Sequence, residues 1–388
     1  MTSSKPQFDG QCVKLGDVAT YINGYAFKPA DYSLNGKQII RIQDLTGNAY
    51  QTNNFAGELD DKYLVSSGDV LISWSASLGV FEWNKEEAWL NQHIFKVVFN
   101  KLPVDKRYFI HQARYVINRG AMLAHGATMR HLTKKVFESL PFSYPNRSEQ
   151  LTIAKRLDDI QRQIYLAEKQ ISKLDSLVKS RFVEIFGDFA CYETKPLIKC
   201  VDCIEAGKSP KCLAFSRKMA EPGVLKLSAI SSGVYCENEN KALPRSVSLT
   251  IDKVVHANDI LLSRKNTPEL VGRSVLVKHT DGNIMFPDII FRMHPLPPIN
   301  AMYLSYLLAG PLLHSIQSLA HGSAKSMSNI PKSELAKLSI PIPALNLQNE
   351  FANFVSQVDK SRFGGMLRLL NSLSGIMHAS FFSVADTD

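Results

Sequence analysis

The stretch SEQLTIAKRLDDIQRQIYLAEKQISKLDSLVKSRFVEIFG, from Ser148 to Gly187, decides the fold. Its apolar residues step by three and four positions, which is the heptad spacing of a coiled-coil seam. A single helix of this length would span about 55–60 Å, more than one globular core needs. We therefore expect a spacer helix, with this seam: Ile153, Leu157, Ile160, Ile164, Ala167, Ile171, Leu174, Val178 and Ile185, interrupted by Arg181.

A second stretch of the same character, LNLQNEFANFVSQVDKSRFGGMLRLLNSLSGIMHASFF, runs from Leu345 to Phe382. When the two stretches are aligned, Gln348 corresponds to Gln150. We expect the two helices to pack antiparallel, with a kink where Gly364–Gly365 interrupts the second seam before it resumes at Met366. The alternative is two ordinary amphipathic helices of one large domain.

The composition is typical of a folded chain of two or three domains, with 388 residues, 45% hydrophobic and 21% charged. No apolar run approaches the ~18 residues of a membrane span, and no signal peptide is recognisable, so we expect a cytoplasmic protein without a membrane. The net charge of +9 lies in residues 1–146 (16 basic, 13 acidic) and 189–344 (18 basic, 12 acidic). This excess suits contact with a polyanion, although a basic surface without a nucleic-acid role remains the alternative.

Six cysteines in a chain of this length do not form a disulfide framework, and we expect free thiols. Four of them could in principle form a zinc site, but their spacing matches no common finger, so structural cysteines are the preferred interpretation. The four are Cys200, Cys203, Cys212 and Cys236.

The region before the first long helix recurs before the second, as six ordered correspondences. Each copy contains an amphipathic run with a glycine, two buried strands, a helix, an AHG turn and a proline exit. The pairs are LGDVATYINGYAFKP and LIKCVDCIEAGKSP, SSGDVLISW and HANDILLSR, HIFKVVF and IIFRMHP, helices at Tyr108–Asn118 and Tyr303–Ala309, AHG at Ala124–Gly126 and Ala320–Gly322, and LTKKVFESLPFSYP and IPKSELAKLSIPIP.

The repeat predicts an α+β fold with two mixed α/β lobes and two spacer helices. The expected divisions are a first lobe at 1–146, a central helix at 147–188, a second lobe at 189–344 and a C-terminal helix at 345–388. Antiparallel packing of the helices would relate the lobes by an approximate two-fold axis.

Catalytic motifs are poorly represented. Gly207-Lys208-Ser209 resembles the end of a phosphate-binding loop, but Asp202 stands where the first glycine belongs and Pro210 interrupts the helix that should follow. We find no G-x-G-x-x-G and no Asn/Asp-Pro-Pro-Tyr. His125 and His321 sit at equivalent places beside glycines, and we interpret them as turn residues rather than as a catalytic pair.

Binding chemistry is better represented, because basic, amide and aromatic side chains gather in predicted loops of both copies. Arg and Lys contact phosphates or guanine, and Asn and Gln can pair with adenine. For each residue alone, a solvated surface charge is an equal alternative. The candidates are Tyr25, Lys28, Arg41, Gln43, Ser73, Trp74, Arg130, His131 and Lys134 in the first lobe, and Lys208, Lys211, Arg217, Lys218, Arg264, Lys265, Asn266 and Lys325 in the second.

Three apolar residues of the first long helix, Tyr165, Leu177 and Phe182, lie off the predicted seam. Exposed apolar side chains on a helix pair are typical of a protein-docking surface. We therefore expect these three to contact a partner protein.

The alternation of two divergent lobes with two related helices resembles the specificity subunits of type I restriction-modification systems. The helix entries carry most of the resemblance: SLPFSYPNRSEQLTIAKRLDDIQRQI with KLDSLVKSRFVEIFG, and PIPALNLQNEFANFVSQVDK. IEAGKSP matches the family's Gly-x-Ser/Thr-Pro loop, INGYAFK is a variant that lacks the proline, and SGDVLIS and ANDILLS match its strand signature.

The resemblance implies that each lobe is a target-recognition domain for one half of a split, asymmetric DNA target. It implies that the helices set the separation and dock two methyltransferase subunits, with restriction-translocase subunits completing the complex. This chain would be non-catalytic and without a cofactor, since S-adenosylmethionine, ATP and Mg²⁺ would act in the partner subunits. A coiled-coil tethering protein without sequence-specific DNA binding and a stand-alone DNA-modifying enzyme remain the alternatives.

Overall fold

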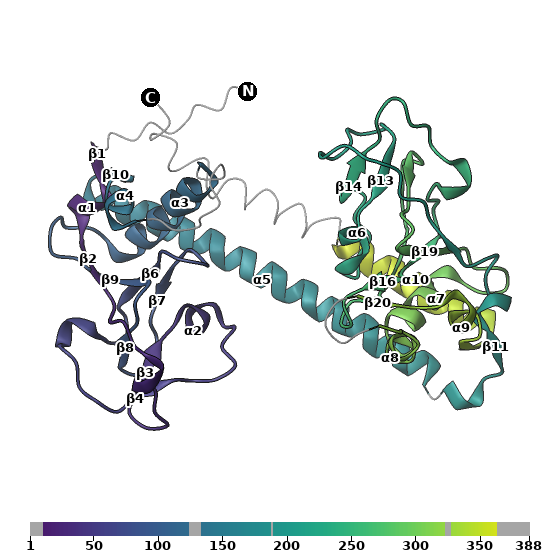
Figure 1. Ribbon diagram of the computed structural model, residues 1–388, viewed down its shortest axis with the longest axis horizontal. Helices are drawn as coiled ribbons and strands as arrows, with labels where there is room; N and C mark the ends of the chain where they lie inside the picture. Colours follow the sequence, from purple (N-terminus) through teal and green to yellow (C-terminus); the bar gives the residue numbers. More distant parts are fainter. Residues whose placement is uncertain (1–10, 124–132, 188, 323–326, 363–388) are drawn as a thin grey trace. The chain divides into compact units, whose positions relative to one another are not determined.

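The computed structural model describes residues 11–123, 133–187, 189–322 and 327–362 (Figure 1). These residues form two compact units, the first containing those up to Gln170 and the second those from Ile171 onwards. Each unit mixes short strands with helices, which confirms the mixed α and β class predicted from the sequence.

The first unit contains three sheets. An antiparallel sheet has the order β2-β9-β6-β7, a second sheet β4-β3-β8-β5 includes a parallel β3–β8 pair, and β1 pairs with β10. The elements are β1 (Gln11–Lys14), α1 (Leu15–Val18), β2 (Thr20–Asn23), β3 (Lys37–Ile40), α2 (Ile42–Thr46), β4 (Asn54–Phe55), β5 (Leu64–Val65), β6 (Val70–Ser73), β7 (Gly79–Glu82), β8 (Ala88–Leu90), β9 (Ile94–Val98), α3 (Lys106–Leu123), α4 (Lys134–Glu138), β10 (Pro141–Tyr144) and the first part of α5 (Arg147–Phe186).

The second unit repeats this topology. Its antiparallel sheet has the order β12-β19-β15-β17, its sheet β14-β13-β18 includes a parallel β13–β18 pair, and β11 pairs with β21 and β16 with β20. After the last part of α5 come β11 (Thr194–Pro196), β12 (Glu205–Ala206), β13 (Gly223–Leu225), α6 (Ser228–Ser231), β14 (Asn240–Ala242), β15 (Ile260–Ser263), β16 (Lys265–Asn266), β17 (Ser274–Leu276), β18 (Ile284–Met285), β19 (Ile290–Met293), α7 (Ala301–Ala309), α8 (Leu313–Ser318), β20 (Ser328–Asn329), α9 (Lys332–Leu335), β21 (Ser339–Pro341) and α10 (Leu345–Ser361).

The internal repeat seen in the sequence is therefore confirmed at the level of topology. The strands β6 and β15, read from SGDVLIS and ANDILLS, hold the same place in their sheets, and all four residues of each are buried. Continuous burial explains why both strands read as apolar runs without alternation.

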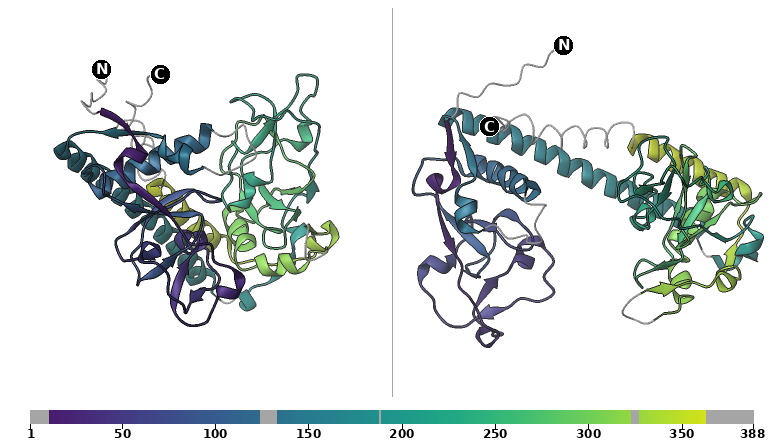
Figure 2. Two further views of the ribbon diagram at one scale, coloured as in Figure 1. Left: turned by 60° about the vertical axis from the view of Figure 1, so that its left-hand side comes forward. Right: turned by 45° about the horizontal axis from the view of Figure 1, so that its top comes forward.

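The core of the first unit lies between the β2-β9-β6-β7 sheet, α3 and the beginning of α5. Ile153 and Leu157, two seam residues, are buried in this core. Figure 2 shows α3 alongside α5, and Asp158 of α5 accepts from Arg107 Nη1 at 3.1 Å and contacts His111 Nε2 at 2.7 Å. The first turns of the long helix thus belong to the unit that precedes it.

In the second unit, α10 packs antiparallel against the last part of α5. Arg181 of α5 pairs with Glu350 of α10 at 2.6 Å, and Asp175 of α5 pairs with Arg362, the residue that caps the end of α10, at 3.0 Å. Residue numbers along α10 therefore rise where those along α5 fall, which is the order of an antiparallel pair. Aromatic rings join the two helices, with Phe351 lying 5.0 Å from Phe182 between ring centroids.

The prediction that Phe182 is exposed for partner docking is wrong, since it is only 4% exposed and packs in the core of the second unit. The α-helical period of 3.6 drifts by about 20° per heptad against a strict heptad. This drift brings Phe182 and Phe186 into the buried stripe, whereas Arg181 lies beside it in ion pairs with Glu184 and Glu350.

Several expectations fall on residues that the structure does not describe: the first AHG turn with His125, the glycine pair at Gly364–Gly365 and the seam from Met366. Across the described part of the chain, no helix combines the length and apolarity that a membrane crossing requires. Within the same residues, no three His, Cys, Asp or Glu side chains are grouped to hold a metal ion.

Candidate nucleic-acid interface

The same glycine turn ends the first strand of the main sheet in both units. A Cβ on Gly24 would lie 2.0 Å from the carbonyl oxygen of Asn91, and one on Gly207 would lie 1.9 Å from that of Phe286. Because real Cβ atoms do not approach so closely, only glycine fits either position. The sequence match between INGYAFK and IEAGKSP therefore corresponds to one shared backbone geometry.

This geometry places Tyr25 and Lys208 at equivalent positions directly after the glycine. The amide of Tyr25 donates to Leu90 O at 2.8 Å, and that of Lys208 donates to Phe286 O at 3.0 Å. Lys208 is exposed, and Tyr25 keeps an exposed edge while its ring packs against Phe27. Both side chains are therefore accessible to a ligand.

The ends of the central strands β6 and β15 form a second pair of equivalent positions, Trp74 and Arg264. Trp74 stacks on Phe95 with ring centroids 5.7 Å apart, and the Arg264 guanidinium lies 5.3 Å from the ring centre of Phe291. Trp74 Nε1 also donates to Asn23 at 3.3 Å. The Trp74 indole and the Arg264 guanidinium thus each pack on a phenylalanine ring at the end of the sheet. Both residues are half-buried, so only part of each is exposed to a ligand.

Four predicted DNA contacts are engaged within the protein. Ser73 is fully buried and donates to Ser77 O, and Asn266 is buried, with its amide nitrogen donating to Ser263 and its amide oxygen accepting from the backbone of Thr267. Both side chains are thus hydrogen-bonded within the protein, and direct contact with a base stays a prediction for each.

The two arginines Arg41 and Arg217 are also internal. Arg41 Nε pairs with Asp44 at 3.2 Å, and Arg217 pairs with Asp281 at 2.8 Å and Glu237 at 3.6 Å. Their side chains are only 13% and 4% exposed. Both guanidinium groups are thus paired within the protein, and contact with DNA stays a prediction for each. The guanidinium of Arg217 also lowers the pKa of the Asp281 carboxyl below its ordinary value.

The remaining candidates fall into two groups. Those on the surface are Lys28, Gln43, Lys134, Lys208, Lys211 and Lys218, with Lys265 half-buried. Of these, Lys134 pairs with Glu138 at 3.7 Å. Arg130, His131 and Lys325 lie outside the described residues.

Some buried polar atoms have no hydrogen-bond partner within the described residues, and in the first unit they mark residues that sequence reasoning missed. In the first unit these atoms are Trp89 Nε1, Asn91 Oδ1 and His93 Nδ1, the last two in the loop facing the glycine turn. In the second they include Arg264 Nε and Asn329 Oδ1, on neighbouring chain segments joined by the β16–β20 pair. The internal repeat could have drawn attention to Asn91 and His93, because they face the glycine turn that it identifies.

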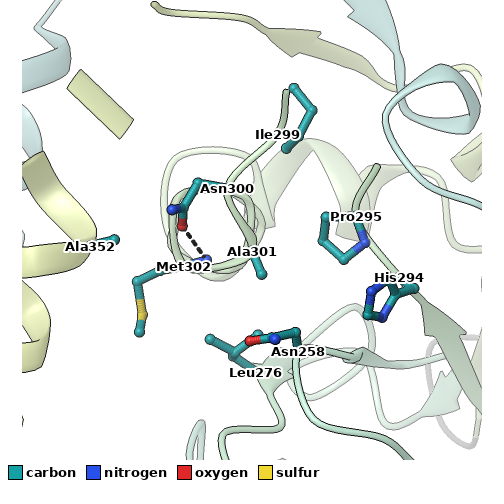
Figure 3. A pocket seen from close by; sticks show the side chains of 9 residues that line it. All are labelled: Asn258, Leu276, His294, Pro295, Ile299, Asn300, Ala301, Met302 and Ala352. Atoms are coloured by element: carbon teal, nitrogen blue, oxygen red, sulfur yellow. Dashed lines mark hydrogen bonds between the residues drawn. The ribbon is translucent and has the colours of Figure 1, made fainter. Parts of the chain in front are cut away.

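A pocket of about 420 Å³ in the second unit lies between the start of α7 and α10 (Figure 3). Asn300 caps α7 by accepting from Met302 N at 2.9 Å, and His294 contacts Asp259 at 3.1 Å on the opposite side. None of the predicted DNA-binding residues lines it, so we assign it no role in recognition.

Comparisons with known proteins agree on one family. The family model described as "Type I restriction modification DNA specificity domain" matches residues 9–176. The type I restriction enzyme EcoBI specificity subunit of Escherichia coli is 22% identical, with 95% of this chain and 85% of that protein covered. The MjaVIII specificity subunit of Methanocaldococcus jannaschii is 23% identical, covering 90% and 86%.

A solved structure shows a similar fold. The crystal structure of the type I restriction-modification S subunit from M. genitalium is 13% identical, covers 97% of this chain and 96% of its own, and has a TM-score of 0.51. Both the full-length sequence relatives and the repeated topology thus point the same way. By a family model over residues 9–176 and by relatives that span most of its length, the chain is similar to type I restriction-modification specificity subunits.

Proposed function

We propose that this chain is the non-catalytic DNA-recognition subunit of a type I restriction-modification complex, and that each unit reads one half of a bipartite target. One observation carries the proposal: two units with the same topology and the same glycine turn present different side chains at equivalent positions. Tyr25 stands where the other unit has Lys208, and Trp74 where it has Arg264. Different side chains select different bases, so the target is asymmetric.

We place the chemistry in partner subunits. Two methyltransferase subunits would use S-adenosylmethionine on adenine, and restriction-translocase subunits would use ATP and Mg²⁺. DNA and these partners meet in the cytoplasm. On this proposal the chain needs no cofactor of its own, and it takes part in catalysis only by selecting the DNA site.

The long helices would act as the spacer. The antiparallel ion pairs Arg181–Glu350 and Asp175–Arg362 support a helix pair within the second unit. We propose that the pairing continues as a coiled coil along α5, which relates the two recognition units by an approximate two-fold axis. The 40 residues of α5 would then set the gap between half-sites.

Exposed apolar side chains on α5 support partner docking. Tyr165 is 60% and Leu177 49% exposed. Leu166 is also exposed and precedes Leu177 by three helical turns, so these two leucines share one face of the helix. Val183 is exposed and follows Tyr165 by five turns, so these two residues share a second face. Two apolar lines on a charged helix are the surface that two methyltransferase subunits would cover.

The test is to map methylated adenines by single-molecule sequencing in source cells with and without this gene. A split, asymmetric motif that is lost on deletion is the expected result. An unchanged methylation pattern favours a tethering protein without sequence-specific binding. Methylation or cleavage by the purified chain alone, with S-adenosylmethionine or Mg²⁺, favours a stand-alone enzyme.

A further inference from the structure

The loop between β12 and β13, residues 207–222, holds two large apolar side chains in solvent. Met219 is 93% exposed and Phe215 is 63% exposed. Exposed apolar residues scattered singly are ordinary, but two within five positions of one loop are a small apolar surface of the kind that marks a binding site.

This exposure does not result from a loose loop. The backbone of residues 213–215 is bound to β14, with Leu213 N donating to Ala242 O at 2.9 Å and Ala242 N donating to Phe215 O at 3.0 Å. Arg217, buried between two carboxylates, donates to Glu221 O at 2.7 Å and so closes the tip of the loop around Met219. The fold thus holds the apolar tip in place rather than burying it.

The loop that carries the tip holds more exposed cations than carboxylates. Lys208, Lys211 and Lys218 are exposed, and within the described residues none of them forms an ion pair. Glu221 is the one carboxylate among loop residues 207–222. Two carboxylates from outside the loop, Glu237 and Asp281, pair with Arg217, and Asp281 also accepts from the backbone nitrogen of Ala220. A loop with three exposed, unpaired lysines and an apolar tip fits a polyanion that has apolar surface between its charges, as DNA has stacked bases between its phosphates.

The first unit has the same feature at the same place. Its loop between β2 and β3, residues 24–36, carries Leu34 at 95% and Tyr32 at 42% exposure. Asn54 of β4 holds this tip by donating to Leu34 O at 3.0 Å, and Lys28 of the loop is exposed. Two loops that differ in sequence but present an apolar tip at one topological position indicate a shared contact.

We propose that these loops are DNA wedges, in which Leu34 and Met219 insert at base steps and unstack them. The inference rests on the proposed DNA recognition. It adds a contact that depends on how easily a base step of the DNA is deformed, and not on hydrogen bonds to base edges. Insertion buries an apolar side chain that is otherwise in water, and it lets the flanking lysines approach the phosphates. In this role Arg217 positions the wedge and does not itself touch DNA.

The experiment uses the full chain co-purified with its methyltransferase partners, and a duplex selected by this complex from a random-sequence pool. Affinity is measured over a series of salt concentrations for Met219→Ser, Leu34→Ser and Lys218→Ala. The control is Ile251→Ser, which removes an exposed apolar side chain of the second unit outside the loop. Permanganate reactivity of thymines across the duplex reports unstacking.

We expect Met219→Ser and Leu34→Ser each to lower affinity by roughly tenfold with an unchanged salt slope, and to remove permanganate-reactive sites. Lys218→Ala should reduce the salt slope by about one, and Ile251→Ser should change nothing. Wild-type affinity in both serine variants overturns the wedge and leaves DNA recognition standing. A loss of methyltransferase partners without a loss of DNA affinity assigns the tips to protein contact and also overturns it. Failure of the wild-type complex to enrich any sequence overturns the proposed function itself, and the wedge with it.

Discussion

Gln150 and Gln348 make the same two hydrogen bonds, each in its own unit. Gln150 Oε1 accepts from the backbone nitrogen of Asp105 at 2.8 Å, and its Nε2 donates to Pro145 O at 2.9 Å. Gln348 accepts from the backbone nitrogen of Asn300 at 2.9 Å and donates to Pro343 O at 2.8 Å. Both side chains are buried. Each glutamine therefore joins the start of a long helix to the N-cap of the helix packed against it and to the proline exit.

This equivalence predicts that Gln150→Leu and Gln348→Leu each destabilise one unit only. Leucine has a similar volume but leaves a buried N–H and a buried carbonyl unpaired, at a cost of about 1–3 kcal/mol for each group. Hydrogen exchange should show faster exchange in α3 for Gln150→Leu and in α7 for Gln348→Leu. Each variant is the control for the other, and equal effects on both helices would contradict independent units.

A second prediction concerns pH. His111 is buried between α3 and α5, facing Asp158, Arg107 and Arg114. Burial lowers the pKa of His111 below its ordinary value, although the carboxylate of Asp158 opposes the shift. Because the unfolded chain then binds the proton more readily than the folded one, stability should be lost as pH falls through about 6.5 and below.

The matched variant is His111→Gln, which can still donate to Asp158 but does not titrate. Exchange protection of α3, measured from pH 7.5 to pH 5, should fall in the wild type and fall less in the variant. Parallel curves for the two proteins would show that another group titrates in this range.

Sequence reasoning predicted the repeat and the long helix because both depend on chain-wide patterns. Buried strands, the glycine turn and the glutamine pair recur in order, so each copy supports the other. What it missed were side-chain partners: Arg217 reads as a free cation, and only the fold brings Asp281 and Glu237 to it. Phe182 failed for a related reason, since a heptad template ignores the helical drift that brings it into the core.

The docking surface gives a third prediction. Tyr165→Glu combined with Leu177→Glu should abolish co-purification of the methyltransferase subunits, because a buried charge on each apolar line cannot be solvated at an interface. Gln163→Glu adds the same charge at an exposed polar position of α5 and should leave the complex intact. Circular dichroism of the double variant must match the wild type. Survival of the complex in that variant would place the docking surface elsewhere.

The last prediction tests the helix as a spacer. Along α5, Leu157 is buried in the first unit, whereas Asp175 already pairs with Arg362 of the second. A seven-residue insertion after Lys173 lies between these contacts and leaves both sets in place. Two helical turns keep the seam Ile171–Leu174–Val178 nearly in phase, and they lengthen the spacer by roughly 10 Å, or about three base pairs at 3.4 Å each.

Methylation mapping of the insertion variant should therefore show the same two half-sites separated by a longer gap. A five-residue insertion at the same point is the matched control, because it turns everything after it by about 140° and takes the seam out of phase. That control should lose methylation altogether. An unchanged gap with full activity in the seven-residue variant would mean that α5 does not set the spacing, and altered half-sites would mean that the two units are not the readers of the target.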